Sequence, residues 1–406
     1  MEIIYERCCG LDIHKAVIVA CVNIKGKKEI QSFGTMTDDL LRLCTWLKSK
    51  SVQMAAMEST GSFWKPIFNL LEVEEIPAIL VNAQHIKAVP GRKTDVKDSE
   101  WIADLLRHGL LRASFVPKRE MRELRELVRY RSSITDERAR ELNRLDKVLQ
   151  GANIKLSSVA SHLDTKSSLD MLTAISEGKF DTSVLVSMAR GTMKSKKDAL
   201  LKALKGLIQP HQQMILKAML SHISSLSSLI DTLNAEIEAR MIEDAELIET
   251  LDGITGVGKI SAQVILTEIG TNMEQFPTAA HLASWSGMCP GNDESAGKKK
   301  SGRTRKGNPS LKRTLVQCGR SAANSKNTYL NSLYKRVAAR RGSKKAVVAV
   351  AHAILIICYH MIKNKSSYNE LGADYFTNLN KEDIVKRSVK RIEALGYKVQ
   401  VEAIPA

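Results

Sequence analysis

"CCGLDIHKAVIVACVNI", residues 8–24, is an apolar stretch that carries one carboxylate, Asp12. Together with "KKEIQSFG" (27–34), to which it is joined at "KGK", it predicts β-strands. An acid inside an apolar strand is costly unless it is paired or binds a cation. Asp12 is therefore the first candidate for a functional residue, and the strands around it define the first domain.

The segments that follow alternate between helical and strand patterns. Strands first, then alternating helix and strand, predict a mixed α/β sheet with helices on both faces. The predicted elements are a helix at 37–50 with Thr37 as N-cap, a strand at 52–60, a helix at 63–75, a strand at 77–83 and a helix from Asp95 to about Leu111.

Three further acids fit the same edge of this sheet. Glu58 ends its predicted strand, and a parallel neighbour would bring it close to Asp12. Asp95 and Asp98, at i and i+3, share one helix face. Four converging carboxylates cannot all stay ionised without cations, and hard oxygen ligands suit Mg²⁺ or Mn²⁺ in phosphodiester chemistry. The alternatives are a helix-dipole role for Asp95 and Asp98 and a surface-turn role for Glu58.

A helical, coiled-coil-like middle region follows. Residues 118–150 are highly charged, contain no Gly or Pro, and repeat leucines along one stripe, which predicts a long amphipathic helix. Residues 196–250 form a second such region. The two patterns fit either an intramolecular helical hairpin or self-association. The Ser-rich stretch at 155–195 is expected to be less regular.

The last segment predicts a mostly helical domain. "GITGVGK" (253–259) separates two helical patterns and resembles a helix-hairpin-helix loop, which presents backbone amides to a DNA phosphate; the alternative is a plain helix connection. The apolar stretch 346–362 fits a buried core helix better than a membrane span. "GYKVQVEAI" (396–404) is a possible strand. The predicted domains are 1–115, 116–245 and 246–406.

The charge is unevenly distributed along the chain. The formal net charge is +17, yet residues 1–100 carry 13 basic and 13 acidic side chains, while residues 295–369 carry 18 Lys and Arg and no Asp or Glu. A segment that excludes one sign predicts a polyanionic partner, nucleic acid. Aromatic residues are only 5%, which argues against stacking on unpaired bases as the main binding mode.

The Gly-rich, basic stretch 289–313 is a candidate phosphate-binding loop. Ser295 has small neighbours, so a phosphodiester could approach its hydroxyl, but Ser284, Ser286, Ser301 and Ser310 compete. A serine needs activation by a base or a metal. The candidate nucleic-acid contacts are Gly256, Gly258, Lys259, Lys298, Lys299, Lys300, Arg303, Arg305, Lys306, Lys312 and Arg313.

The motifs "GLDIHK", "MESTGSFW" and "RKTDVKDSEWIADLLRHG" resemble the DEDD transposases of the insertion-sequence one-ten family, whose first domain is RuvC-like and RNase H-like. "ETLDGITGVGKISAQVILTEIG" and "FPTAAHLASWSGMCPGNDESAGKKKSGRTRKGNPSLKRTLVQCG" resemble the C-terminal transposase domain of the same family. The resemblance implies that Asp12, Glu58, Asp95 and Asp98 are catalytic and hold metal, and that Ser295 is the nucleophile. This chain has Ser-Ala-Gly where Ser-Gly is common, so Ser301 is the fallback.

The resemblance also implies the reaction and the partners. The expected activity is excision and insertion of a mobile element by Mg²⁺-assisted serine transesterification on donor and target double-stranded DNA, directed by a guide RNA. A homo-oligomer, a dimer that assembles to a tetramer, is expected. The alternatives are a Holliday-junction-type resolvase or nuclease that uses water, and a nucleic-acid-binding protein with inactive acids.

The seven cysteines show no CxxC pair, which favours buried reduced thiols. With no signal-peptide pattern at the N-terminus, the expected location is the cytoplasm of a prokaryotic cell, at the nucleoid and away from membranes.

Overall fold

The computed structural model describes residues 2–59, 61–82, 98–291, 293–295, 298–301, 303–379 and 381–402, with the side chains of 292–302 and 382–384 left out. The chain divides into two compact units, Met1–Arg119 and Glu120–Ala406. The three sequence domains, with boundaries at 115/116 and 245/246, remain a prediction.

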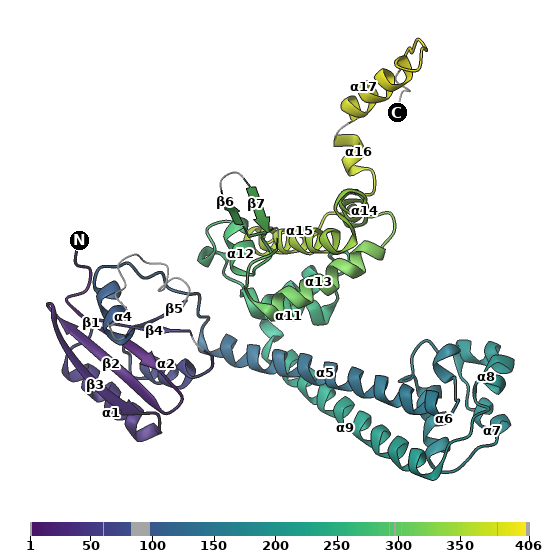
Figure 1. The fold of residues 1–406 in the computed structure, drawn as a ribbon, viewed down its shortest axis with the longest axis horizontal. Helices are drawn as coiled ribbons and strands as arrows, with labels where there is room; N and C mark the ends of the chain where they lie inside the picture. Colours follow the sequence, from purple (N-terminus) through teal and green to yellow (C-terminus); the bar gives the residue numbers. More distant parts are fainter. Residues whose placement is uncertain are drawn as a thin grey trace. The chain divides into compact units, whose positions relative to one another are not determined.

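The first unit is built on a mixed five-stranded sheet with the order β3-β2-β1-β4-β5 (Figure 1). Strands β1, β2 and β3 pair antiparallel, while β4 is parallel to both β1 and β5. The sequence prediction of a mixed sheet is confirmed. The strands are β1 (Arg7–Ile13), β2 (Val17–Ile24), β3 (Lys27–Gly34), β4 (Met54–Glu58) and β5 (Ala78–Val81).

The quoted stretch 8–24 contains two of these strands, because the chain turns back between Ile13 and Val17. The amide of His14 donates to the carbonyl of Val17 at 2.9 Å and closes this turn. Asp12 therefore lies next to the end of β1 rather than in the middle of a long strand.

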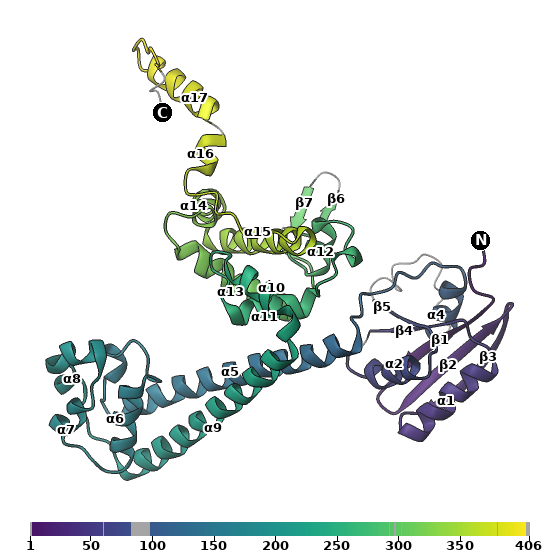
Figure 2. The same ribbon diagram turned by 180° about the vertical axis from the view of Figure 1, so that it is seen from behind.

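Helices cover both faces of the sheet, as predicted (Figures 1 and 2). Helices α1 (Thr37–Ser49) and α2 (Trp64–Val73) pack with Leu11, Ala55 and other apolar residues of one face. Helix α4 (Asp98–Arg107) packs on the opposite face, over Cys8 and Ala56. The N-cap of α1 is Met36, without a side-chain cap, so the predicted cap Thr37 is instead the first helical residue.

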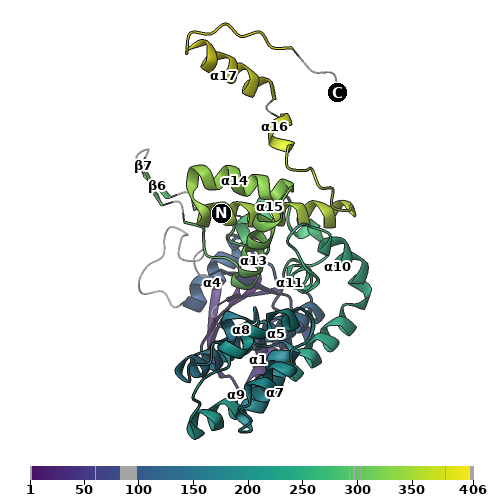
Figure 3. The same cartoon turned by 90° about the vertical axis from the view of Figure 1, so that its right-hand side faces the viewer.

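The second unit begins with two long antiparallel helices, α5 (Arg119–Gly151) and α9 (Pro210–Arg240), which run side by side in Figures 1 and 2 and are viewed nearly along their length in Figure 3. Arg131 donates to Asn234 at 3.1 Å and Arg138 to Ser227 at 2.7 Å, so residue numbers rise along one helix as they fall along the other. The two predicted amphipathic regions therefore pair within one chain.

The connection between these helices is more regular than the sequence predicted. It contains α6 (Lys166–Ser176), α7 (Thr182–Ser187), α8 (Lys197–Ala203) and two short 3₁₀ turns. Apolar residues of these short helices form one cluster with Leu145 and Leu149 of α5 and Leu216 and Ile223 of α9. This tertiary packing stabilises helices whose Ser-rich sequences have weak propensity.

The remainder of the second unit is mostly helical around α15 (Ser343–Asn364). By length and composition alone, α15 is a candidate membrane span, but half of its apolar window is buried. A Cβ atom added to Gly319 would lie 2.8 Å from the Val347 carbonyl oxygen, so α13 crosses α15 at very close range. This packing supports the prediction of a core helix. The other elements are α10 (Ala245–Asp252), α11 (Lys259–Ile269), α12 (Ala279–Trp285), β6 (Asp293–Ser295), β7 (Lys298–Ser301), α13 (Pro309–Asn324), α14 (Tyr329–Arg341), α16 (Tyr375–Leu379) and α17 (Lys381–Glu393).

The C-terminal strand suggested by "GYKVQVEAI" is wrong for its described part. Residues 396–402 form no strand, and Tyr397 and Val401 are exposed. Alternating apolar and polar residues suggested a strand there, but this segment pairs with no strand among the described residues.

Candidate active site and nucleic-acid interface

Asp12 and Glu58 lie at corresponding positions on neighbouring parallel strands. Leu11 of β1 pairs with Met57 of β4, and each acid is the next residue along its strand. Alternation places both acids on the sheet face of Cys8 and Ala56, the face that α4 covers. The sheet register thus sets the backbones of the two acids side by side at the carboxyl edge.

The first turn of α4 lies over the same strand. A Cβ atom added to Gly10 would lie 2.2 Å from the Ser99 carbonyl oxygen and 2.5 Å from the Ala103 amide nitrogen. Only glycine permits this approach. Asp98 is the first described residue of this helix, so the contact at Gly10 fixes its backbone next to the strand that carries Asp12.

Asp95 lies outside the described residues, so the structure places three of the four predicted acids, namely Asp12, Glu58 and Asp98. Within the described part of the chain, no group of three or more His, Cys, Asp or Glu side chains gathers closely enough to hold a metal ion. The oxygen donors of Asp12, Glu58 and Asp98 have the chemistry that Mg²⁺ prefers. The metal site therefore stays a prediction supported by strand register and donor type.

Asp12 has one close neighbour with a titratable ring. The Nε2 atom of His14 lies 3.1 Å from Asp12 Oδ2, and the Asp12 side chain is 26% exposed. A protonated His14 would compete with a cation for this oxygen, whereas a neutral ring would orient the carboxylate.

Asp104, on the same helix as Asp98, has a structural role. It accepts hydrogen bonds from Lys28 at 2.6 Å and from Asn23 at 3.2 Å. Lys28 also lies 3.8 Å from Glu100. These contacts fasten α4 to β2 and β3 and leave Asp104 out of the candidate site.

Ser295 lies in a β-hairpin, whereas the sequence predicted a flexible, Gly-rich loop. The backbone of Ser295 in β6 pairs with Lys298 in β7, and a second bridge joins Pro290 to Thr304. The amide of Gly291 donates to the Arg303 carbonyl at 2.8 Å. Backbone pairing therefore includes the candidate nucleophile, whose side chain is not among those described. The fallback, Ser301, ends β7 on the other strand.

Two glycines fix the base of this hairpin. A Cβ atom on Gly307 would lie 2.3 Å from the Gly287 amide nitrogen, and one on Gly287 would lie 2.8 Å from the Arg305 carbonyl oxygen. Gly287 also has a φ of +72°. The segment that leaves the hairpin is thus packed directly on the turn that follows α12.

A buried carboxylate, Glu268, ties this segment to two helices. Its side chain is fully buried and accepts two hydrogen bonds from Arg129 of α5, each 2.7 Å long. It also accepts a 2.6 Å hydrogen bond from Asn308, whose side-chain oxygen caps α13 by accepting from the Leu311 amide at 3.1 Å. The bidentate pair therefore connects α5 and α11 with the exit of the hairpin.

The network keeps Glu268 ionised. Burial alone would raise the pKa of Glu268, but hydrogen bonds from Arg129 and Asn308 and the nearby charge of Arg125 hold that pKa below its ordinary value. Burial in turn lowers the pKa of Arg125 to about 10, well above neutrality. The sequence carries a signal for Glu268, because an acid within the apolar run "QVILTEIG" is costly to bury unless it is paired.

The predicted nucleic-acid contacts fall into three groups. Lys298, Lys299 and Lys300 lie on β7, where only the backbone is described. Arg303, Arg305 and Lys306 follow the hairpin and are exposed. On α13, Lys312 donates to the hydroxyl of Thr304, and Arg313 forms a two-pronged ion pair with Asp136 of α5. The last two cations thus also stabilise the fold.

"GITGVGK" forms the predicted turn between α10 and α11. Gly256 has a φ of +87°, and a Cβ atom there would lie 2.6 Å from the Ala322 amide nitrogen. Close packing on α13 therefore explains this glycine without any ligand. Gly258 is the N-cap of α11, and Lys259 lies 2.7 Å from Glu238 in an exposed ion pair. A DNA contact through these three residues remains a prediction.

The buried cysteines are poor candidates for a nucleophile. All seven are free, and six are buried. Burial raises the pKa of Cys8 to about 11 and that of Cys21 to about 12, so neither is a thiolate near neutrality.

Two family models match this chain. Residues 9–154 match the model DEDD_Tnp_IS110, described as a transposase, and residues 248–335 match the model described as the transposase IS116/IS110/IS902 family. A Streptomyces coelicolor relative, described as an uncharacterized 43.6 kDa protein of insertion element IS110, is 28% identical over 158 residues. That match covers 38% of this chain and 38% of the relative.

Proposed function

Since this chain belongs to the IS110 family of transposases, with matches in both units, we propose that it cuts and rejoins DNA by serine transesterification, assisted by Mg²⁺ or Mn²⁺ and directed by a guide RNA. The observation that carries this proposal is the register that sets Asp12 beside Glu58 on the α4 face of a parallel strand pair. Such an edge, within an RNase H-like sheet, is suited to metal-dependent phosphodiester chemistry.

Asp12, Glu58, Asp95 and Asp98 would hold the divalent ion. When bound, the ion would neutralise charge that develops on the phosphodiester oxygens. His14 orients the Asp12 carboxylate through the 3.1 Å contact. Gly10 holds the first turn of α4 in place, and with it the backbone of Asp98.

Ser295 would supply the nucleophile in two balanced steps. In the first, its Oγ bonds to phosphorus, one bridging phosphorus–oxygen bond of the DNA breaks, and the serine proton passes to the departing DNA hydroxyl. In the second, a hydroxyl of the exchanged strand attacks the phosphoserine, rejoins the DNA and returns the proton to Ser295. The number of phosphodiester bonds is conserved, so no external energy source is required.

The charge distribution fits this division of work. The acids lie in a segment of zero net charge, whereas 18 cations and no acids occur between residues 295 and 369. The cations would collect DNA and a guide RNA by backbone charge, and base pairing by the RNA would supply sequence choice. The acids and Ser295 would meet from one chain or from two subunits of a homo-oligomer, dimer or tetramer.

A covalent-adduct assay tests the proposal. The full chain is incubated with guide RNA, donor and target DNA and Mg²⁺, then denatured and separated by size. We expect a protein–DNA adduct that is absent in Ser295→Ala and in Asp12→Asn and unchanged in Ser301→Ala. DNA cleavage without an adduct, retained in Ser295→Ala, would overturn the proposal in favour of a water-using resolvase.

A further inference from the structure

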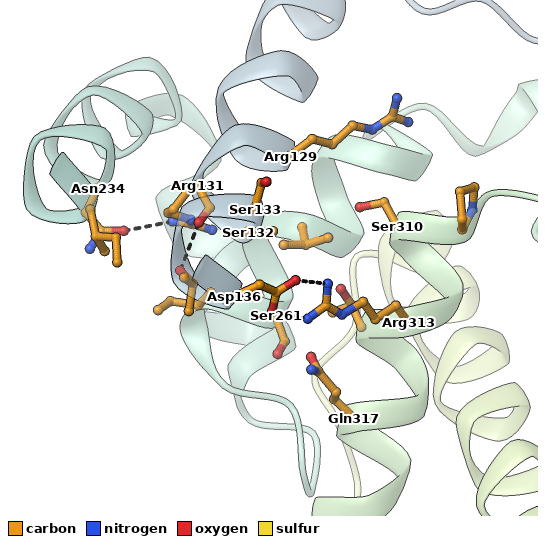
Figure 4. Close-up of a pocket in the computed structure, with 16 residues that line it drawn as sticks. Arg129, Arg131, Ser132, Ser133, Asp136, Asn234, Ser261, Ser310, Arg313 and Gln317 are labelled. Atoms are coloured by element: carbon orange, nitrogen blue, oxygen red, sulfur yellow. Dashed lines mark hydrogen bonds and ion pairs between the residues drawn. The ribbon is translucent and has the colours of Figure 1, made fainter. Parts of the chain in front are cut away.

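A pocket of about 500 Å³ lies within the second unit, apart from the hairpin and from the "GITGVGK" glycines (Figure 4). Its walls come from α5, α9 and the first turns of both α11 and α13. Hydroxyl and amide groups of Ser132, Ser133, Ser310 and Gln317 line it, so its surface is suited to a hydrogen-bonding ligand.

Three arginines contribute to these walls, and only two of them have carboxylate partners. Arg129 pairs with Glu268, and Arg313 with Asp136, the pair drawn across the pocket in Figure 4. Glu268 also lies 3.5 Å from Arg125, so four arginines share two carboxylates around this pocket and the local charge is positive.

Arg131 is buried with neutral hydrogen-bond acceptors. It is 2% exposed, and its Nη1 atom donates to Gln263 at 2.7 Å and to Asn234 at 3.1 Å. Its Nη2 atom has no hydrogen-bond partner among the described residues. Burial lowers the pKa of Arg131, although the group stays cationic near neutrality. The charge of Glu238 favours the cation from a distance, and an anion in the adjoining pocket would stabilise the buried Arg131 further.

Two helix N-termini add to this positive field. Ile260 and Ser261 of α11 and Pro309 and Ser310 of α13 border the pocket, and neither helix has an acid in its first turn. Gly258, the N-cap of α11, provides no side-chain cap. The partial positive charge at each N-terminus favours a bound anion.

We propose that this pocket holds one phosphodiester of a bound nucleic-acid strand, with Arg313 and Ser310 as its recognition groups and the buried charge of Arg131 behind them. A phosphodiester carries one negative charge and several acceptor oxygens, which match the positive local charge and the hydroxyl, amide and guanidinium donors of the lining. The site extends the proposed function, but it depends only on binding and not on the chemistry of Ser295.

The test introduces a negative charge where it does not harm the helix. Ser310→Glu places a carboxylate in the first turn of α13, where it complements the helix dipole, so the fold should be retained. Ser321→Glu makes the same change on the same helix, at an exposed position outside the pocket. Gln317→Glu provides a second, nearly isosteric pocket variant.

Binding of each full-length variant to short duplex DNA and to single-stranded RNA of equal length is measured in EDTA over a range of salt. We expect Ser310→Glu to weaken binding roughly tenfold, as loss of one charged hydrogen bond predicts. The log-log salt slope should fall by about 0.9 if the strand is duplex DNA, or about 0.7 if it is single-stranded RNA. Ser321→Glu should preserve the slope.

Equal weakening by Ser310→Glu and Ser321→Glu would overturn the inference, because net charge alone would then explain the loss. Unchanged binding in both pocket variants would overturn it as well. If the proposed function alone were wrong, the result would be different. No protein–DNA adduct would form, but Ser310→Glu would still weaken nucleic-acid binding.

Discussion

The two regions that carry the candidate chemistry are held in place by different forces. At the edge of the sheet, backbone register and apolar packing set the positions of Asp12 and Asp98, with Gly10 allowing α4 to touch β1. At the exit of the hairpin, a fully buried carboxylate, Glu268, holds two arginines and Asn308. Apolar packing is disrupted by a change of volume alone, whereas a buried ionic network is disrupted by the loss of one charge even at constant volume.

The largest expected effect comes from Glu268→Gln, which keeps the volume and removes the charge. We expect the free energy of unfolding to fall by about 3 kcal/mol, the low end for a broken buried pair, because Arg129 is 47% exposed. Urea denaturation measures it. The matched control is Glu236→Gln, which breaks an exposed pair with Arg240 and should cause no resolvable change. A similar loss in both variants would contradict the buried-network account.

Gly10→Val tests the sheet side of the comparison by adding volume without charge. Its Cβ would lie 2.2 Å from the Ser99 carbonyl oxygen, so α4 must move, at a cost of about 2 kcal/mol or more. Binding of Mn²⁺, followed by electron paramagnetic resonance, should be weakened as well.

The control for this variant is Gly151→Ala, where the added Cβ meets nothing closer than 3.5 Å. We expect it to be neutral or slightly stabilising. Retention of full stability and Mn²⁺ affinity in Gly10→Val would refute the role assigned to the glycine contact.

Lowering the pH should weaken the Glu268 network at the exit of the hairpin. The folded-state pKa of Glu268 lies below the ordinary value of 4.5, so its stabilisation is fully present above that pH and is lost as the pH falls through the folded pKa. The difference in unfolding free energy between the wild type and Glu268→Gln should therefore be constant above pH 4.5 and shrink below it. A difference that grew on acidification would show that the sign is wrong.

The smallest effect is expected for Lys259→Gln, in the exposed pair with Glu238. We expect little change in stability, since exposed pairs contribute little. If the predicted DNA contact exists, the salt slope on duplex DNA should fall by about 0.9. An unchanged slope would restrict the "GITGVGK" turn to its packing role.

The sequence predicted the sheet region better than the region around Glu268 and the hairpin. The reason is that the sheet depends on local patterns, whereas the other region depends on distant contacts. Alternation and apolar spacing are local signals, so the mixed sheet, its covering helices and the long α5 helix could be predicted. The position of Asp12 relative to Glu58 followed from assuming parallel neighbours, which the register of β1 and β4 now provides. The turn at His14 was missed because the stretch 8–24 is apolar on both sides of it.

The network around Glu268 could not be predicted from local pattern. Arg129 lies 139 residues from Glu268 in the sequence and Asn308 lies 40 residues from it, and only the tertiary fold brings them together. The hairpin around Ser295 was missed for a related reason. Its sequence is rich in Gly and Lys, and the structure forms strands there because backbone groups pair across the turn.

The most direct measurement of the central claim is the identity of the residue that becomes joined to DNA. The denatured adduct would be digested with protease and nuclease, and the modified peptide sequenced by mass spectrometry. We predict a nucleotide phosphate on Ser295, formed only with a divalent ion and only when Asp12 and Glu58 are intact. A phosphate on Ser301, or cut DNA with no modified peptide at all, would contradict the account.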